Sequence, residues 1–286
     1  MKIGVTQIVL GDWPLSEVRS LCTEAGYQAV ELFFREGGDP DIELPEDEIR
    51  RIGQEFSSAG IEVTSVIAWH KDRGNFLTPD PAAREAARRT LARGIEIAGI
   101  LGAPVVLLHP GGMDPKGSYL TVWETFAVEM RRMGEFASRY GVKIGVENVW
   151  NRFLLSPMEA KLFFDRVAHP NVGLYLDTAN MMLFGYTEQW IQDLGPHVVA
   201  VHFKDFRRAD FKFVDLMDGD TDWAAVVDGG GGFTPVEHSV YDNPTVGTPD
   251  GLVERARSMS YVASLDEDHL ADVRNLFIGF VFQQFN

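Results

Sequence analysis

The sequence predicts an α/β protein that folds as a (β/α)8 TIM barrel in one domain over residues 1–286. Short apolar runs alternate with amphipathic segments about every 30 to 40 residues, which is typical of βαβ units in a parallel sheet. The length of 286 residues suits eight such units, since a barrel takes roughly 250. The alternative is an open doubly wound sheet. No Gly-x-Gly-x-x-Gly follows the first strand, which disfavours the dinucleotide form of that fold and a nucleotide cofactor.

The expected strands are short runs rich in Val, Ile, Leu and Phe, each bounded by polar or turn-forming residues. In chain order they cover residues 3–8, 29–34, 61–68, 104–108, 144–147, 172–177 and 198–202. A weaker run at 233–237 is the expected eighth strand.

The expected helices are amphipathic segments with recognisable start and stop signals. They cover residues 16–25, 45–59, 81–98, 121–140, 156–167 and 188–194. Proline stands in the first turn of three of them, at Pro45, Pro81 and Pro157. Glycine follows three of them as a C-terminal stop, at Gly26, Gly60 and Gly141.

The regular pattern weakens after residue 203. A seventh helix can begin at 222–227, but the glycines at 229–232 stop it, so we expect it to be shortened or irregular. Residues 228–286 are expected to form an irregular part that closes the barrel, with a loop at 238–250 and helices at 252–259 and 266–285. The apolar end of the last helix, 276–282, is expected to cover the barrel or a neighbouring subunit, which favours a homodimer or larger homo-oligomer.

Charge and composition exclude several classes of partner. The formal net charge of −16 repels phosphate backbones, so nucleic acid is a poor candidate. The single cysteine, Cys22, excludes an internal disulfide framework and favours a reducing, cytoplasmic location. No secretory leader and no apolar run of about 18 residues is present, so no membrane association is expected.

Polar residues stand where several of the apolar runs end. Glu147, Asp177 and His202 each end an expected strand, and Glu237 ends the weaker run, with Glu254 as its alternative. In a parallel barrel the ends of successive strands converge on one mouth. Carboxylates around one imidazole suit a divalent cation with open positions for substrate, so we expect one Mn²⁺, Mg²⁺ or Co²⁺ ion.

Other side chains are expected to line the same mouth. The histidines His70 and His109 end two further strands, and Glu31 either points into the mouth or forms a buried salt bridge. The charged run after His202 is either a solvated loop or a clamp for an anion or hydroxyl, formed by Lys204, Arg207 and Arg208. The aromatic side chains that can form an apolar wall are Trp69, Trp150 and Phe153.

Several stretches resemble the sugar phosphate isomerase/epimerase superfamily, the xylose isomerase-like barrels. They cover residues 80–84, 101–111, 147–157, 176–180, 201–206 and 218–223. The resemblance extends from residue 1 to about 227 and is strongest to the hexulose-6-phosphate isomerase-like and xylulose-5-phosphate 3-epimerase-like proteins. It implies that Glu147, Asp177, His202 and Glu237 are the metal ligands. The run at 229–232 and Asn180, where some ketose 3-epimerases have a substrate-binding histidine, depart from the family pattern.

The resemblance implies a sugar or sugar-phosphate epimerase or aldose–ketose isomerase. Proton transfer through a metal-stabilised enediolate would use Glu147 and Glu237 on opposite sides of the carbon. The side chains expected to bind substrate are His70, His109, Trp150, Asn180, Lys204 and Arg208. The alternatives are a dehydratase on a keto-sugar or keto-inositol and a catalytically impaired sugar-binding barrel. A DNA-repair endonuclease is disfavoured by the charge and by Asn180.

Overall fold

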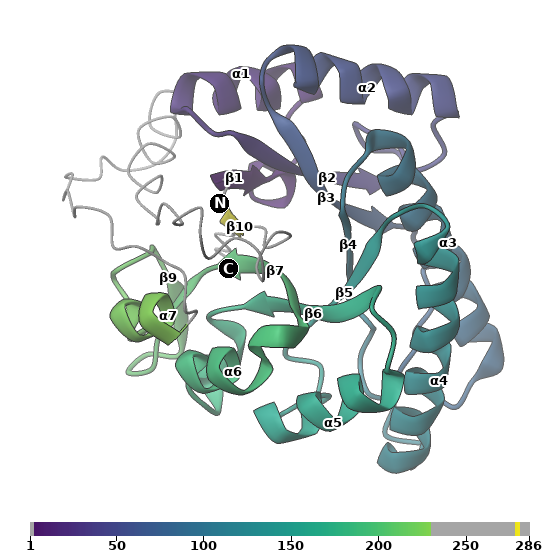
Figure 1. Cartoon of the computed structure of the whole chain (residues 1–286), viewed down its shortest axis with the longest axis vertical. Coiled ribbons are helices and arrows are strands. Elements are labelled where there is room, and N and C mark those ends of the chain that lie inside the picture. Colours follow the sequence, from purple (N-terminus) through teal and green to yellow (C-terminus); the bar gives the residue numbers. More distant parts are fainter. Residues whose placement is uncertain (1–2, 230–277, 281–286) are drawn as a thin grey trace.

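The chain forms the closed parallel barrel that the sequence predicts (Figure 1). The computed structural model describes residues 3–229 and 278–280. Its barrel strands are β1 (Ile3–Thr6), β2 (Ala29–Arg35), β3 (Glu62–Trp69), β4 (Val105–Leu108), β5 (Lys143–Glu147), β6 (Val172–Asp177), β7 (Val198–Phe203) and β10 (Ile278–Phe280). Around the barrel the order is β1-β10-β7-β6-β5-β4-β3-β2, and each neighbouring pair is parallel.

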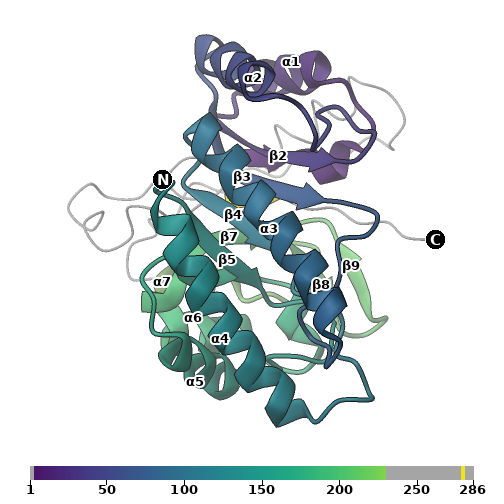
Figure 2. The ribbon, with the colours of Figure 1, turned by 90° about the vertical axis from the view of Figure 1, so that its right-hand side faces the viewer.

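Helices surround the sheet, and α3, α4 and α5 run side by side along its outer face (Figure 2). The helices are α1 (Leu15–Ala25), α2 (Glu46–Ser58), α3 (Pro81–Leu101), α4 (Tyr119–Ser138), α5 (Pro157–Val167), α6 (Thr187–Leu194) and α7 (Trp223–Gly229). Short 3-10 turns are η1 (Gln7–Leu10), η2 (Asn180–Leu183) and η3 (Gly195–His197). The seventh helix spans 7 residues within the part of the chain that the structure describes. Within residues 3–229 no helix is both long and apolar enough to cross a bilayer.

Two helix starts follow from the capping residues that the sequence contains. Asp80 accepts a hydrogen bond from the backbone N–H of Ala82, with proline in the first turn of α3. Ser156 accepts from the N–H of Glu159, whose carboxylate accepts in return from the N–H of Leu155. These reciprocal bonds satisfy donors at the start of α5, directly after the loop that follows Glu147.

The barrel interior holds a cluster of buried side chains from β2, β3, β4, β6 and β7. They are Ala29, Ile67, Val105, Leu107, Tyr175, Val199 and Ala200. Tyr175 fits because residue 145 is glycine: a Cβ there would lie 2.8 Å from Cδ2 of the tyrosine ring. The Tyr175 hydroxyl reaches β2 and donates to Oε2 of Glu31, at 2.7 Å.

The strand that closes the barrel is not the one that the sequence analysis expected. Residues 278–280 were expected to be helical, but they form β10, which pairs with β1 on one side and β7 on the other. A uniformly apolar run contains no period that separates helix from strand. The free edges of β1 and β7 provide backbone partners on both sides, which favours the strand. Residues 233–277, with Glu237 and Glu254, lie outside the described residues.

A hairpin that the sequence analysis did not expect follows β7, built from β8 (Asp205–Arg207) and β9 (Lys212–Val214). It leads into α7, and the buried carboxylate of Asp205 holds this connection together. Its Oδ1 accepts from the backbone N–H groups of Phe206 and Thr221 and from the Thr221 hydroxyl. Its Oδ2 accepts from the N–H groups of Met217 and Gly219 and from the indole of Trp223.

Candidate metal centre

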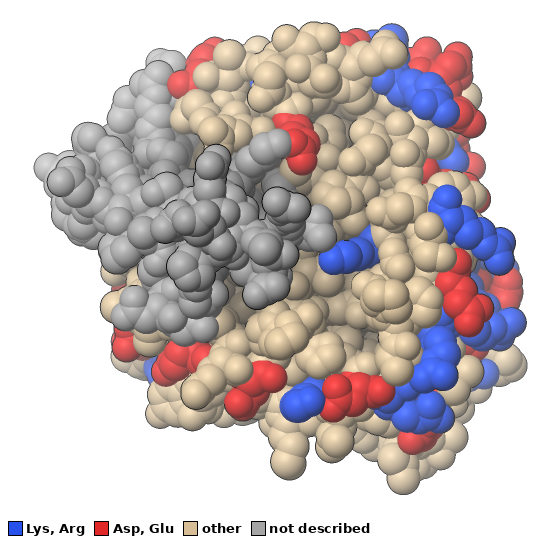
Figure 3. Space-filling model, in the orientation of Figure 1, with Lys and Arg blue, Asp and Glu red and all other residues tan. Residues whose placement is uncertain are grey.

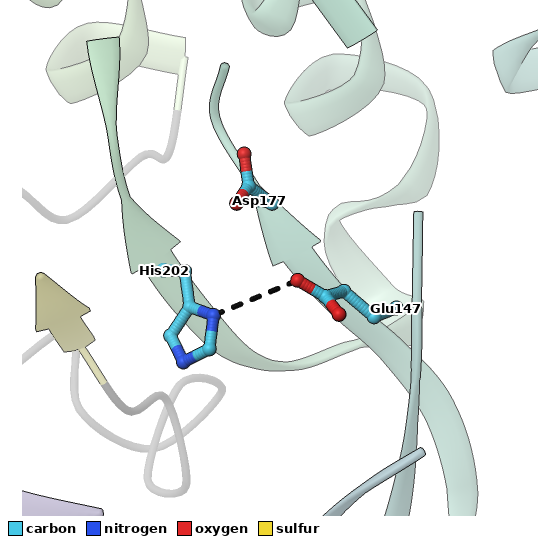
Figure 4. A group of neighbouring side chains, drawn as sticks. All are labelled: Glu147, Asp177 and His202. Carbon is cyan, nitrogen blue, oxygen red and sulfur yellow. Dashed lines mark ion pairs between the residues drawn. The ribbon is translucent and has the colours of Figure 1, made fainter. Parts of the chain in front are cut away.

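Three of the predicted ligands meet at the carboxyl ends of adjacent strands. Glu147 ends β5, Asp177 ends β6 and His202 lies opposite Asp177 on β7. Each offers one ligand atom, and these atoms lie within 4.8 Å of one another (Figure 4). We call these three residues the metal triad.

One ring nitrogen of His202 forms a hydrogen bond, and the other has no hydrogen-bond partner in the described part of the chain. Its Nε2 lies 3.0 Å from Oε1 of Glu31, and both side chains are buried. Its Nδ1 lies 3.7 Å from Oε1 of Glu147 and is buried without a hydrogen-bond partner among the described residues. Glu31 is therefore a buried ion-pair partner of His202, which is one of the two roles that the sequence left open.

Charge coupling between Glu31 and His202 outweighs the effect of burial on both groups. Burial alone would lower the pKa of His202, but the carboxylates of Glu31 and Glu147 together raise it to about 10. Burial alone would raise the pKa of Glu31, but the His202 imidazole holds it at about 2. The hydroxyls of Ser65 and Tyr175 donate to Oε2 of Glu31 and fix its orientation, at 2.6 and 2.7 Å.

The donor set fits a divalent cation. The free Nδ1 of His202 faces two carboxylates, and one imidazole with oxygen ligands suits Mn²⁺, Co²⁺ or Zn²⁺. Opposite ligands about 2.1 Å from an ion lie roughly 4.2 Å apart, so atoms within 4.8 Å need little movement to close around one. A carboxylate on the far nitrogen of a ligating histidine is a common outer partner in metal sites, and Glu31 supplies it.

The carboxylate of Asp177 is oriented by its own backbone turn. Its Oδ1 accepts from the N–H groups of Ala179 and Asn180, at 2.9 and 2.8 Å. Its Oδ2 lies 3.8 Å from Nζ of Lys204. Burial raises the pKa of Asp177, whereas the nearby ammonium of Lys204 acts in the opposite direction and favours the ionised carboxylate. The side chain of Asn148 bonds both the N–H and the carbonyl of Asp177, which ties the end of β5 to the end of β6.

The metal triad forms part of the wall of a cavity of about 500 Å³ at this end of the barrel. The cavity is also lined by four of the side chains that the sequence analysis selected for substrate, His109, Trp150, Asn180 and Lys204. Nδ1 of His109 accepts from the N–H of Gly111 at 3.2 Å, so the proton of the neutral ring belongs on Nε2. Burial lowers the pKa of His109, which favours this neutral form.

One wall of the cavity is aromatic. The indole of Trp150 stacks on Phe213 of β9 with ring centres 4.9 Å apart, and its N–H donates to the carbonyl of Asn180. The ammonium of Lys204 lies 3.5 Å from the centre of the Phe213 ring and 3.3 Å from Oδ1 of Asn180. Phe213 was not selected from the sequence, because the hairpin that carries it was read as a loop.

Several other selected residues lie elsewhere. His70 does not line the cavity: its Nε2 lies 3.0 Å from Oε1 of Glu43. Arg207 pairs with Asp210, and Arg208 donates to the carbonyl of Gly185, so neither guanidinium points into the cavity. Of the expected aromatic wall, Trp69 lines the cavity, while Phe153 packs in the helical core against Phe126 and Phe163. Of the clamp that the sequence analysis expected from Lys204, Arg207 and Arg208, only Lys204 is among the residues that line this cavity.

The fold agrees with the comparisons with known proteins. A family model described as "Xylose isomerase-like TIM barrel" matches residues 20–229, so the chain belongs to that family. A comparison with curated proteins gives no match.

Solved structures share the fold at low sequence identity. A D-psicose 3-epimerase superposes with a TM-score of 0.71 and 14% identity, covering 100% of this chain and 86% of that chain. An IOLI protein with a bound zinc atom gives 0.68 and 19%, covering 81% and 84%. A D-tagatose 3-epimerase-like protein gives 0.66 and 20%, covering 80% and 85%.

Proposed function

We propose that the protein is a divalent-metal-dependent sugar or sugar-phosphate epimerase or isomerase. The observation that carries this proposal is the unpartnered Nδ1 of His202, which faces the carboxylates of Glu147 and Asp177 at the wall of a sugar-sized cavity. The family, and relatives named as 3-epimerases of D-psicose and L-ribulose, support the same class of reaction.

The described residues can supply the parts of a proton transfer next to a carbonyl. A bound cation would polarise that carbonyl and stabilise the negative charge that develops on it. His202 and Asp177 would hold the cation, and Glu147, whose carboxylate borders the cavity, would take or return the proton at its free oxygen. Neutral His109 can donate from Nε2 to a substrate oxygen. Glu237 stays our proposed fourth ligand and second proton carrier.

A dehydratase is the second candidate, because it would begin with the same proton abstraction. One structural relative is a probable 3-DHS dehydratase. The two reactions differ in their products, since elimination leaves an unsaturated or deoxy compound.

The test has two measurements on the purified protein. Elemental analysis should find one divalent ion per chain, with manganese, magnesium, cobalt and zinc as the metals to compare. When ketoses and ketose phosphates are incubated with the protein in D₂O, deuterium should replace a carbon-bound proton of the substrate. NMR spectra of the same samples distinguish an epimer from an elimination product.

Two variants complete this test. Asp177→Asn should lose the metal and the exchange while keeping the far-UV circular dichroism of the wild type. Asp193→Asn changes an exposed aspartate of α6 in the same way and should keep both. Full metal occupancy with normal exchange in Asp177→Asn would refute the site. Our prediction of a homodimer or larger assembly is tested separately by light scattering.

A further inference from the structure

Arg73 is a cation in the cavity that the proposed reaction does not use. It lies in the loop between β3 and α3 and lines the same cavity as the metal triad. Its guanidinium lies 3.1 Å from the centre of the Trp69 ring, and this contact fixes the plane of the group at the end of β3. The side chain is half-buried.

No carboxylate among residues 3–229 forms an ion pair with Arg73. Two acidic groups near the end of β3 are already engaged: Glu36 pairs with Lys71, and Glu43 pairs with His70. Desolvation by burial lowers the pKa of Arg73, as expected for a cation that has given up water without gaining an anion. An anion in the cavity would therefore be stabilised by this guanidinium.

The basic groups on the outer surface differ from Arg73. Over α2, α3 and α4 they lie among acidic side chains (Figure 3). Typical pairs are Arg51 with Glu48 at 2.7 Å and Arg88 with Glu129 at 2.7 Å. Inside the cavity, Lys204 is held near Asp177 and Asn180. Among the described residues that line the cavity, Arg73 is the basic side chain that forms no ion pair with a carboxylate, whereas Lys204 lies 3.8 Å from Asp177.

The electrostatics of His109 relate Arg73 to the metal triad. Besides burial, Glu147 raises the pKa of His109 and Arg73 lowers it, so the imidazole is within electrostatic reach of both. The cavity therefore has an acidic region at Glu147 and Asp177 and a basic region at Arg73. A substrate with a carbonyl at one end and an anion at the other has the complementary polarity.

We propose that Arg73 binds an oxyanion of the substrate, a phosphate ester or a carboxylate, and so selects acidic sugars over neutral ones. The inference rests on the proposed function for the reacting end of the substrate. The guanidinium fork matches either oxyanion through paired N–H donors. With a net charge of −16 the protein as a whole repels anions, so a local cation is needed to bind one in the cavity.

The kinetic test compares three substrates that differ only at carbon 6: D-fructose, D-fructose 6-phosphate and D-fructuronate. Deuterium exchange into each is measured for the metal-loaded wild type, Arg73→Met, Arg73→Lys and the surface control Arg51→Met. Arg73→Met should raise KM for the preferred acidic ketose about ten- to a hundredfold, with little change in kcat or in KM for D-fructose. Arg73→Lys should be intermediate, since it keeps the charge but loses the fork. Whether Arg73 binds a phosphate or a carboxylate is decided by which substrate, D-fructose 6-phosphate or D-fructuronate, shows the larger rise in KM in Arg73→Met. Equal effects on neutral and acidic substrates would overturn the proposal.

A binding measurement separates this inference from the proposed function. Inorganic phosphate and acetate are titrated by calorimetry into metal-loaded wild type and metal-loaded Arg73→Met, and into Asp177→Asn, which is expected to hold no metal. One of the two anions should bind the wild type and Asp177→Asn but bind Arg73→Met about ten- to a hundredfold more weakly. If no sugar exchanges deuterium while this pattern holds, the proposed function fails and the anion site stands. If neither anion binds the wild type, or Arg73→Met binds it equally well, the anion site is refuted.

Discussion

Asp205→Asn should destabilise the segment that joins β7 to α7. The carboxylate of Asp205 is fully buried, and five different residues donate to it. Asparagine has nearly the same shape but only one acceptor oxygen. Its NH₂ group would face at least two backbone N–H groups, those of Met217 and Gly219 or those of Phe206 and Thr221. Two hydrogen-bond donors, the amide NH₂ and a backbone N–H, would then face each other in the protein interior, and neither would have an acceptor.

The expected loss can be worked out from these bonds. A hydrogen bond to a charged group contributes about 1.5–3 kcal/mol, so the loss of two gives roughly 3–6 kcal/mol. Because the loop can relax, we expect a value near the lower end, about 3 kcal/mol. In a domain of this size that corresponds to a fall in Tm of roughly 6–12 °C.

Thermal denaturation followed by circular dichroism measures the loss, and hydrogen exchange of residues 215–223 shows whether it is local. The matched control is Asp218→Asn, an exposed aspartate of the same segment, which should be within about 0.5 kcal/mol of the wild type. If Asp205→Asn were as stable as this control and equally protected from exchange, the network would not hold the segment as we argue. Since the hairpin carries Phe213, the variant should also weaken substrate binding in the cavity.

Two further predictions concern the barrel interior. In metal-free protein the pKa of His202 is about 10, above the ordinary value of 6.5 that it has in the unfolded chain, so its stabilising contribution is complete below about pH 6.5 and is lost as the pH rises towards 10. The Tm of protein freed of metal by a chelator should therefore fall across this pH range, and Glu31→Gln should make the fall smaller. A wild-type Tm that does not change with pH in this range would contradict the ion pair. Gly145→Ala should cost about 1–3 kcal/mol in urea denaturation, because its Cβ would lie 2.8 Å from the Tyr175 ring, and wild-type stability would show that the barrel tolerates the added methyl.

Most of the barrel could be predicted from local patterns. Apolar runs, helix-starting prolines and stopping glycines placed the strands and helices up to residue 203 close to their observed positions. Capping at Ser156 is a local interaction and is therefore visible in the sequence. By contrast, β10 depends on two strands far away in the chain, β1 and β7. The sequence of residues 276–282 alone does not indicate that this segment pairs with β1 and β7.

Part of the site could also be predicted, because some of its residues are marked by a local sequence pattern. Glu147, Asp177 and His202 share one local context, the end of an apolar strand, and the closed sheet brings them together. The role of Glu31 required knowing that its side chain faces His202 across the barrel. Arg73 lies in a charged run at 70–73 that reads as a solvated loop, and only the structure places it in the cavity.

The position of β10 has a consequence for how the protein folds. Its first residue, Ile278, pairs with Ile3, so the last gap in the barrel is closed by two segments about as far apart as the chain allows. Contacts of such large sequence separation form slowly, because a long loop must close first. Until then the other strands form a curled sheet whose edge strands, β1 and β7, present unpaired N–H and C=O groups. During synthesis these edges stay open until residue 280 has emerged from the ribosome. We therefore expect aggregation to compete with folding at this late stage, and a slow last folding phase that depends on residues 278–280.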